Sequence, residues 1–291
     1  LLSRRQRQMC IRDRTDKIHA AIEKLASGET SYKVDVNDFS SLEAELAEGL
    51  NRISDGLETA LAEQVKSERL KADLITNVSH DIKTPLTSII NYVDLIKRQH
   101  IEDPTVQKYL EVLDQKSQRL KTLTEDLVEA SRASSGNIKL ETTNIDFVEL
   151  VQQTTGEFEE KYAIRHLEIV NTLPNEVIMI EADGRRLWRV LENLYNNAFK
   201  YALEGTRVYV TIEDHGADVV FTIKNVSANP LNISPDELTE RFVRGDVSRT
   251  TEGSGLGLSI AKDLTTLQGG KFELIIDGDL FKAQITFPIK N

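Results

Sequence analysis

Residues 78–86 read Val-Ser-His-Asp-Ile-Lys-Thr-Pro-Leu and lie within a helical pattern of apolar residues. His80 and Thr84 are four residues apart, so a helix places both on one face, with Asp81 next to the histidine. Pro85 cannot donate its amide to the carbonyl of Asp81, which predicts a loosened or bent helix here. The segment therefore predicts an imidazole, a carboxylate and a hydroxyl on a polar, deformable helix surface. A solvated surface histidine is the alternative.

The apolar helical pattern continues on both sides of this segment. Upstream, apolar residues alternate at spacings of four and three, which is typical of a coiled-coil seam: Leu46, Leu50, Ile53 and Leu57. Downstream, a second helix is expected to start at Asp103-Pro104 and to end at Ser134-Ser135-Gly136. Each helix of this hairpin has one apolar stripe, which is too thin to form a core. Pairing with a second copy into a four-helix bundle would bury both stripes, so we expect a homodimer.

The beginning of the chain differs in composition from the rest. Residues 1–14 are rich in Arg and Gln and resemble a translated sequencing-adapter sequence, with a basic juxtamembrane stretch as the alternative. Residues 15–67 contain two helical patterns joined by a polar connector, the first ending at Ser27-Gly28 and the second beginning near Ser41. We treat residues 1–14 as a non-native or disordered leader and expect a chain truncated upstream.

The overall composition excludes several classes of protein. A chain of 291 residues predicts about two domains with a helical appendage. Its net charge of −11 argues against broad nucleic-acid binding, which needs a basic face. The single cysteine, Cys10, excludes an intrachain disulfide and a cysteine-based metal site. No stretch reaches the ~18–20 apolar residues of a membrane-spanning helix, so we do not expect this piece to cross a bilayer.

From residue 137 onward, the pattern changes to alternating helices and strands. Helices are expected over residues 147–162, 184–202 and 256–267. Strands are expected over residues 167–170, 177–180, 207–212, 219–224, 271–276 and 281–288. Residues 225–254 are polar and show neither period. This part predicts an α/β sandwich, a mixed sheet with helices on one face, so the whole chain belongs to the α+β class.

The helix expected over residues 184–202 carries a polar stripe. Asn193, Asn197 and Lys200 follow at i, i+4 and i+7, on one face. Amide oxygens can coordinate a hard cation, and an ammonium group can bind phosphate. Asparagine is a poor helix former, so its repetition in this helix favours a binding site over a solvent-exposed face.

Three glycines alternate just before the last expected helix, at Gly253, Gly255 and Gly257. Their conformational freedom lets backbone amides point at an anion, and the helix N-terminus favours negative charge. A dinucleotide-binding motif is excluded because the preceding segment is polar and the spacing is not G-x-G-x-x-G, and a P-loop lacks its Gly-Lys-Ser/Thr. We therefore expect a mobile flap ahead of a phosphate-binding turn, flanked by Arg244 and Arg249.

Together, these motifs resemble those of the sensor histidine kinases of two-component systems, over about residues 68–289. Four segments carry the resemblance: Val78–Leu86 is similar to the phosphoacceptor box, Asn193–Tyr201 to the Asn box, Glu240-Arg241-Phe242 to the Phe box, and Gly253–Gly257 to the second glycine box. The resemblance implies a dimerisation and histidine-phosphotransfer hairpin over residues 68–136. It also implies a HATPase catalytic domain of the GHKL (Bergerat) type over residues 137–291. Residues 15–67 resemble, more loosely, a HAMP signal-relay module, which in that family follows a transmembrane helix.

The resemblance also implies a role for each motif residue. His80 would attack the γ-phosphate of ATP through Nε2 while Asp81 holds the proton of the other ring nitrogen. Thr84 would position water to dephosphorylate the response regulator, a phosphatase activity. Asn197 would coordinate Mg²⁺, with Asn193 beside it. The implied ATP-binding residues are Asn193, Asn197, Lys200, Tyr201, Asn225, Phe242, Arg244, Arg249, Gly253, Gly255, Leu256 and Gly257.

The implied cofactors are ATP and Mg²⁺, and the implied partners are a second copy of the chain and the receiver domain of a cognate response regulator. No nucleic acid is expected as a partner. The resemblance further implies that the chain is the cytoplasmic portion of a bacterial sensor kinase anchored in the membrane upstream.

One motif departs from the family pattern. The first glycine box of that family usually reads Asp-x-Gly-x-Gly, but here Asn225 stands in the place of the Asp, and both glycines are missing. An amide oxygen can still accept a hydrogen bond from the adenine amino group, although the bond is weaker without a full charge. We expect ATP binding with reduced affinity or an altered lid.

Two other classes of function stay open on the sequence. ATPases of the same fold, of the gyrase, MutL and heat-shock chaperone types, place a catalytic Glu four residues before the metal-binding Asn. Here that position holds Asn193, although Glu192 adjoins it. Fast ATP turnover without protein phosphorylation would favour this class. A non-catalytic dimeric scaffold is favoured by the missing glycines and opposed by the intact Asn and second glycine motifs.

Overall fold

The computed structural model describes residues 16–39, 41–99, 101, 103–136, 138–240 and 254–290. The chain divides into two compact units, Leu1–Lys71 and Ala72–Asn291, and the helix α2 (Ser41–Lys97) contributes to both. Within the described residues, no helix is both long and apolar enough to cross a membrane.

The first unit is a helix, a connector and the first part of α2. Residues 16–26 are helical, and the chain turns at Gly28, whose φ of +93° is readily adopted by glycine. The connector contains the short 3₁₀ helix η1 (Val36–Asp38). Asn51 of α2 holds the connector, because its side chain accepts from the Val34 amide and donates to the Val34 carbonyl, both at 2.9 Å. Both expected boundaries, the stop at residues 27–28 and the start near residue 41, are confirmed.

The predicted helical hairpin is present in the second unit. It consists of the end of α2, which is 57 residues long and contains Pro85, and of α3 (Pro104–Ser134). The carboxylate of Asp103 caps α3 by accepting from the amides of its first turn. Several large apolar side chains of the hairpin are 38% to 64% exposed in the single chain: Leu70, Leu74, Val78, Ile82, Ile89, Leu113 and Leu120. These are the stripes that the sequence assigns to a dimer interface.

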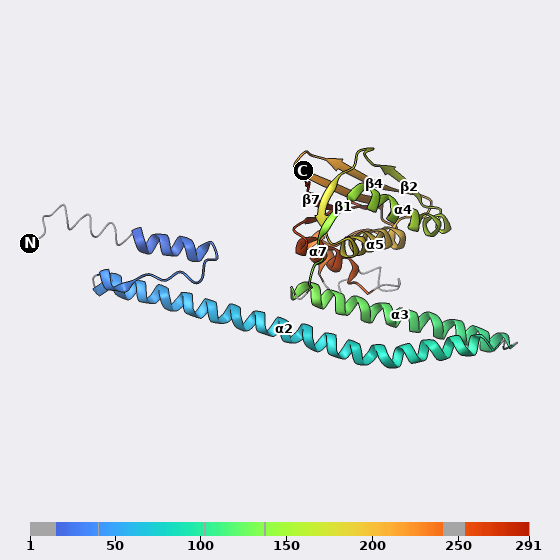
Figure 1. Ribbon diagram of the computed structural model, residues 1–291, viewed down its shortest axis with the longest axis horizontal. Coiled ribbons are helices and arrows are strands. Elements are labelled where there is room, and N and C mark those ends of the chain that lie inside the picture. The colour runs from blue at the N-terminus through green and yellow to red at the C-terminus, as the bar shows by residue number, and fades with distance from the viewer. Residues whose placement is uncertain are drawn as a thin grey trace, which may run out of the picture. The chain divides into compact units, whose positions relative to one another are not determined.

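A mixed five-stranded sheet, in the order β2-β4-β5-β7-β6, lies at the centre of the rest of the second unit. Its strands are β2 (Glu168–Thr172), β4 (Arg207–Asp214), β5 (Asp218–Val226), β7 (Leu280–Pro288) and β6 (Lys271–Asp277). The β2–β4 pair is parallel, and the other pairs are antiparallel. The helices α4 (Phe147–Ile164), α5 (Gly184–Tyr201) and α7 (Gly257–Leu267) lie on one face of this sheet (Figure 1). The predicted α/β sandwich is confirmed.

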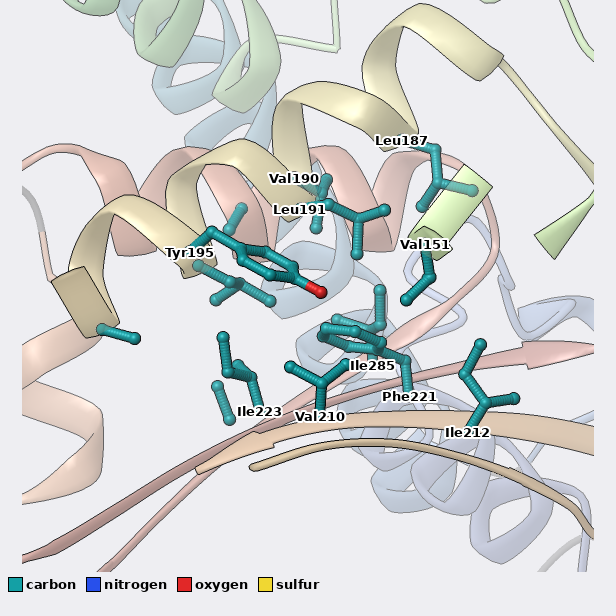
Figure 2. Close-up of a cluster of buried hydrophobic side chains, with 14 of the residues drawn as sticks. Val151, Leu187, Val190, Leu191, Tyr195, Val210, Ile212, Phe221, Ile223 and Ile285 are labelled. Atoms are coloured by element: carbon teal, nitrogen blue, oxygen red, sulfur yellow. The ribbon is translucent and has the colours of Figure 1, made fainter. Parts of the chain in front are cut away.

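The core lies between these helices and the sheet. The apolar face of α5 supplies Leu187, Leu191 and Tyr195, which lie on the side of the helix that faces the sheet, with Phe221 and Ile285 of the strands below them (Figure 2). All five are fully buried. Burial of this face turns the opposite, polar face of α5 away from the sheet, and that orientation creates the candidate site.

Short elements differ from the expected pattern. β1 (Thr143–Asp146) was not expected, and it pairs with β3 (Met179–Ala182) in a separate two-stranded ribbon. The strand expected over residues 177–180 thus lies outside the main sheet. α6 (Pro235–Thr239) lies in the segment expected to lack helices, and a Ser234–Glu237 capping box starts it. Five residues are too few to show a helical period, so that expectation was wrong.

Candidate functional site

A cavity of about 470 Å³ opens beside the polar face of α5. Its lining combines α5 with the end of β5, the segment around α6 and the start of α7. Seven of the residues that the sequence selects line it: Asn193, Asn197, Lys200, Tyr201, Asn225, Gly255 and Gly257. The fold therefore gathers residues from three distant parts of the chain around one space.

The polar stripe of α5 is fixed by contacts within the helix and with α7. The Asn193 Nδ2 donates to the carbonyl of Arg189 at 2.9 Å. Its Oδ1 faces the first turn of α7 so closely that a Cβ on Gly257 would lie 3.1 Å away. A side chain at this position would therefore press on the Asn193 amide and require it to shift by a few tenths of an ångström.

The turn before α7 is built to present backbone amides. Gly255 has a φ of +70°, a conformation that few other residues adopt. The next residue, Leu256, is 2% exposed and anchors the turn in the core. No side chain caps the first amides of α7 among the described residues. Those amides and the helix dipole suit an anion such as a phosphate.

Asn225 contributes an unpaired acceptor to the cavity. The residue is 2% exposed, and its Oδ1 has no hydrogen-bond partner within the described structure. Its Nδ2 donates to the carbonyl of Val226 at 3.2 Å. A buried acceptor without a donor is unfavourable, by about 1–3 kcal/mol. A ligand that brings an amino group, such as the exocyclic amine of adenine, would supply the missing donor.

A charged cluster lies at another part of the cavity lining, and the sequence did not reveal it. Arg189 of α5 contacts three carboxylates: Asp126 at 2.5 Å, Glu129 at 2.9 Å and Glu192 at 2.5 Å. Burial raises the pKa of the Asp126 carboxyl, although the positive charge of Arg189 opposes the shift. One signal was available, because Arg189 precedes Asn193 by one helical turn and shares its face.

The histidine segment lies on the surface of α2. The side chains of His80 and Asp81 are 81% and 86% exposed, and the Nδ1–Oδ1 distance between them is 3.9 Å. The Thr84 hydroxyl donates weakly to the His80 carbonyl, at 3.4 Å. The carboxylate is therefore on the Nδ1 side of the ring, which leaves Nε2 for chemistry. The described lining of the cavity includes none of these three residues.

Four expected ATP-binding residues, Phe242, Arg244, Arg249 and Gly253, lie outside the described residues. Leu256, which was also expected there, is buried in the core and is not among the described residues that line the cavity.

Two family models match the chain, one on each part of the second unit. The model for the His Kinase A (phospho-acceptor) domain matches residues 70–136. The model for the Histidine kinase-, DNA gyrase B-, and HSP90-like ATPase matches residues 182–290. A phosphoacceptor hairpin followed by this ATPase domain places the chain in the histidine kinase family.

Individual proteins agree with this class. VanS, a sensor protein of Enterococcus faecium, is 31% identical over 229 residues, which is 76% of this chain and 58% of VanS. The chain spans between 39% and 58% of the length of the first curated relatives that it matches. Two solved structures share the fold: full-length ShkA in complex with AMPPNP and the histidine kinase ThkA in complex with the response regulator TrrA. For ShkA, the TM-score is 0.64 at 23% identity over 75% of this chain and 46% of that one. For ThkA, the TM-score is 0.53 at 24% identity over 80% and 67%.

Proposed function

We propose that this chain is an ATP-dependent protein-histidine kinase that phosphorylates His80 and passes the phosphoryl group to an aspartate of a response regulator. One observation carries the proposal. An Asn stripe, a glycine turn and an unpaired buried acceptor meet around one cavity, in a chain whose phosphoacceptor hairpin exposes a His-Asp pair. The family of the chain and the response-regulator partner of ThkA support it.

The cavity suits the requirements of phosphoryl transfer, which are positioning and charge neutralisation. Asn225 would orient adenine through its Oδ1. Lys200 and the amides of Gly255 and Gly257 would neutralise the phosphates, while the Leu256 amide donates to the Ser254 hydroxyl at 3.2 Å. Amide oxygens of Asn193 and Asn197 are hard donors that fit Mg²⁺, an ion held by few protein groups together with substrate phosphates. When bound, the ion neutralises phosphate charge, and we expect it to enter with the nucleotide.

The His-Asp pair would perform the transfer. The Nε2 lone pair of His80 forms a bond to the γ-phosphorus while the bond from that phosphorus to the β–γ bridging oxygen breaks and ADP leaves. Asp81 would hold the proton on Nδ1 and so keep Nε2 nucleophilic. An aspartate oxygen of the regulator would then displace the histidine from phosphorus. Thr84 makes only a weak bond, so its hydroxyl could turn to hold the water of a phosphatase reaction.

Glu192 distinguishes this proposal from a direct ATPase. A base that activates water needs an available carboxylate, but the Glu192 carboxylate lies 2.5 Å from the guanidinium of Arg189. The position four residues before Asn197 holds Asn193. Both observations favour transfer to histidine over hydrolysis.

The remaining helices would form the dimer and relay a signal. The exposed apolar stripes of the hairpin suit a second copy of the chain. α2 is continuous from the connector clamped by Asn51 to His80, so a movement in residues 16–67 would reach the histidine along one helix. We place this activity in the cytoplasm, where ATP is available, and attachment of the longer protein to a membrane stays an expectation.

Incubation with Mg²⁺ and γ-labelled ATP tests the proposal. We expect an acid-labile label on the wild type and on His215→Gln, a matched change in an exposed histidine, but not on His80→Gln. Label that survives His80→Gln would refute the mechanism. Rapid ADP release without label would indicate an ATPase, and the absence of both binding and label would indicate a scaffold.

A further inference from the structure

A cationic side chain on the cavity-facing stripe of α5 is occupied by acids. Arg189 lies one turn before Asn193 and lines the same cavity. Its guanidinium is held by Asp126, Glu129 and Glu192, and its side chain is 22% exposed. A guanidinium binds a phosphate in the same forked geometry as a carboxylate. Arg189 is therefore chemically suited to phosphates, but the structure pairs it with carboxylates.

Two of these carboxylates come from α3, which belongs to the phosphoacceptor hairpin. Asp126 and Glu129 have side chains 10% and 16% exposed. The second oxygen of Asp126 accepts from the hydroxyl of Ser254 at 3.0 Å. Ser254 directly precedes the glycine turn and also lines the cavity. A single carboxylate of α3 thus holds two groups of the nucleotide domain, a guanidinium and a hydroxyl.

The charges around Arg189 favour exchange with a phosphate. Three carboxylates face Arg189 and Arg186, whose guanidinium lies 3.0 Å from Glu129. The cluster therefore carries one more negative than positive group. A triphosphate entering this cavity would meet Asp126 as a competitor for Arg189 and as a source of repulsion.

We propose that Arg189 is a phosphate-binding residue and that Asp126 withholds it, together with Ser254, while α3 contacts the nucleotide domain. Separation of α3 would remove the Asp126 and Glu129 contacts and release Ser254, which would leave Arg189 with Glu192 of its own helix as the one carboxylate that a phosphate must displace. Because such coupling is reciprocal, phosphates bound to Arg189 would weaken the α3 contact. This inference rests on the proposed function, since it requires ATP in the cavity.

Nucleotide binding to the full chain tests the inference. Asp126→Asn keeps the shape of the side chain and removes its charge. Glu125→Gln is the matched control, because the adjacent carboxylate of α3 is 48% exposed and pairs with Lys83 at 3.9 Å. We expect Asp126→Asn to lower the Kd for Mg-ATP by about five-fold or more. The control should stay within about two-fold of the wild type.

Adenosine, which lacks phosphates, distinguishes a phosphate contact from a structural effect. In the Asp126→Asn background, Arg189→Lys keeps a cation without the fork and Arg189→Gln removes the charge. We expect Arg189→Gln to reverse the gain for Mg-ATP and Arg189→Lys to retain part of it, with adenosine binding unchanged throughout. Thermal unfolding of each variant confirms that it is folded.

Three outcomes would count against these assignments. If the wild type binds Mg-ATP and Asp126→Asn binds it no more tightly, the inference is overturned and the kinase proposal still stands. If the Kd for adenosine changes as much as the Kd for Mg-ATP, the cluster acts on the structure of the site as a whole, and the assignment of Arg189 to phosphate binding is overturned. A wild type that binds neither ligand would overturn the proposed function itself.

Discussion

Replacing Asn225 with leucine should weaken ATP binding without weakening the fold. The Oδ1 of Asn225 is buried and has no partner among the residues that the structure describes, so its removal eliminates an unsatisfied acceptor rather than a bond. Leucine is similar in volume and has no polar atoms. The same change removes the acceptor that we assign to the adenine amino group. Binding and stability should therefore move in opposite directions.

The size of each effect follows from the burial of this side chain. At 2% exposure, an unpaired neutral acceptor costs about 1–3 kcal/mol in the free protein, and loss of the Nδ2 bond to Val226 offsets about 1 kcal/mol of that gain. The free energy of unfolding should then stay level or rise by about 1–2 kcal/mol. In the complex, loss of the adenine bond should raise the Kd for ATP by about 5- to 100-fold.

Titration calorimetry with Mg-ATP and urea unfolding of the same samples measure the two effects. Asn171→Leu, at an exposed position of β2, serves as the matched control and should leave the Kd for ATP unchanged. An unchanged Kd for Asn225→Leu would show that Asn225 does not read the base. A large loss of stability would show that its Oδ1 has a partner in the folded protein.

Three further perturbations address the turn, the connector and the charged cluster. Gly257→Ala should lower ATP affinity because its Cβ would press on Asn193 at 3.1 Å. Gly156→Ala has open space around it in α4 and should instead stabilise the fold by about 0.5–1 kcal/mol. The two variants are compared by nucleotide titration and thermal unfolding, and equal effects of both on ATP affinity and on the unfolding temperature would contradict this. Asn51→Ala removes two hydrogen bonds to the connector and should lower the free energy of unfolding in urea by about 1–3 kcal/mol. An unchanged urea midpoint would mean that these two bonds do not stabilise the connector. Because burial raises the pKa of Asp126, the folded form keeps its proton to higher pH than the unfolded form, and the contribution of this group to stability falls as the pH rises from about 4 through the raised pKa. Asp126→Asn should lack that decline, and identical pH profiles of unfolding would refute the direction of the shift.

Sequence patterns determined the helical part of the chain and the type of its second domain. The helix boundaries at Gly28, Ser41 and Pro104 follow from local signals, namely a glycine stop, an apolar period and a capped proline. The Asn stripe on α5 also needed only helical spacing. These features are local, because each depends on residues within a few turns of one another.

The tertiary structure decided what those local features do. The unpaired state of the Asn225 oxygen depends on everything that packs around β5, so no spacing in the sequence could reveal it. The contacts of Asp126 with Arg189 and Ser254 join residues 63 and 128 positions apart. The pairing of β3 with β1, rather than with the main sheet, likewise depends on a distant partner. Periodicity assigns a residue to a face, but only packing brings two faces together and leaves a polar atom with or without a partner.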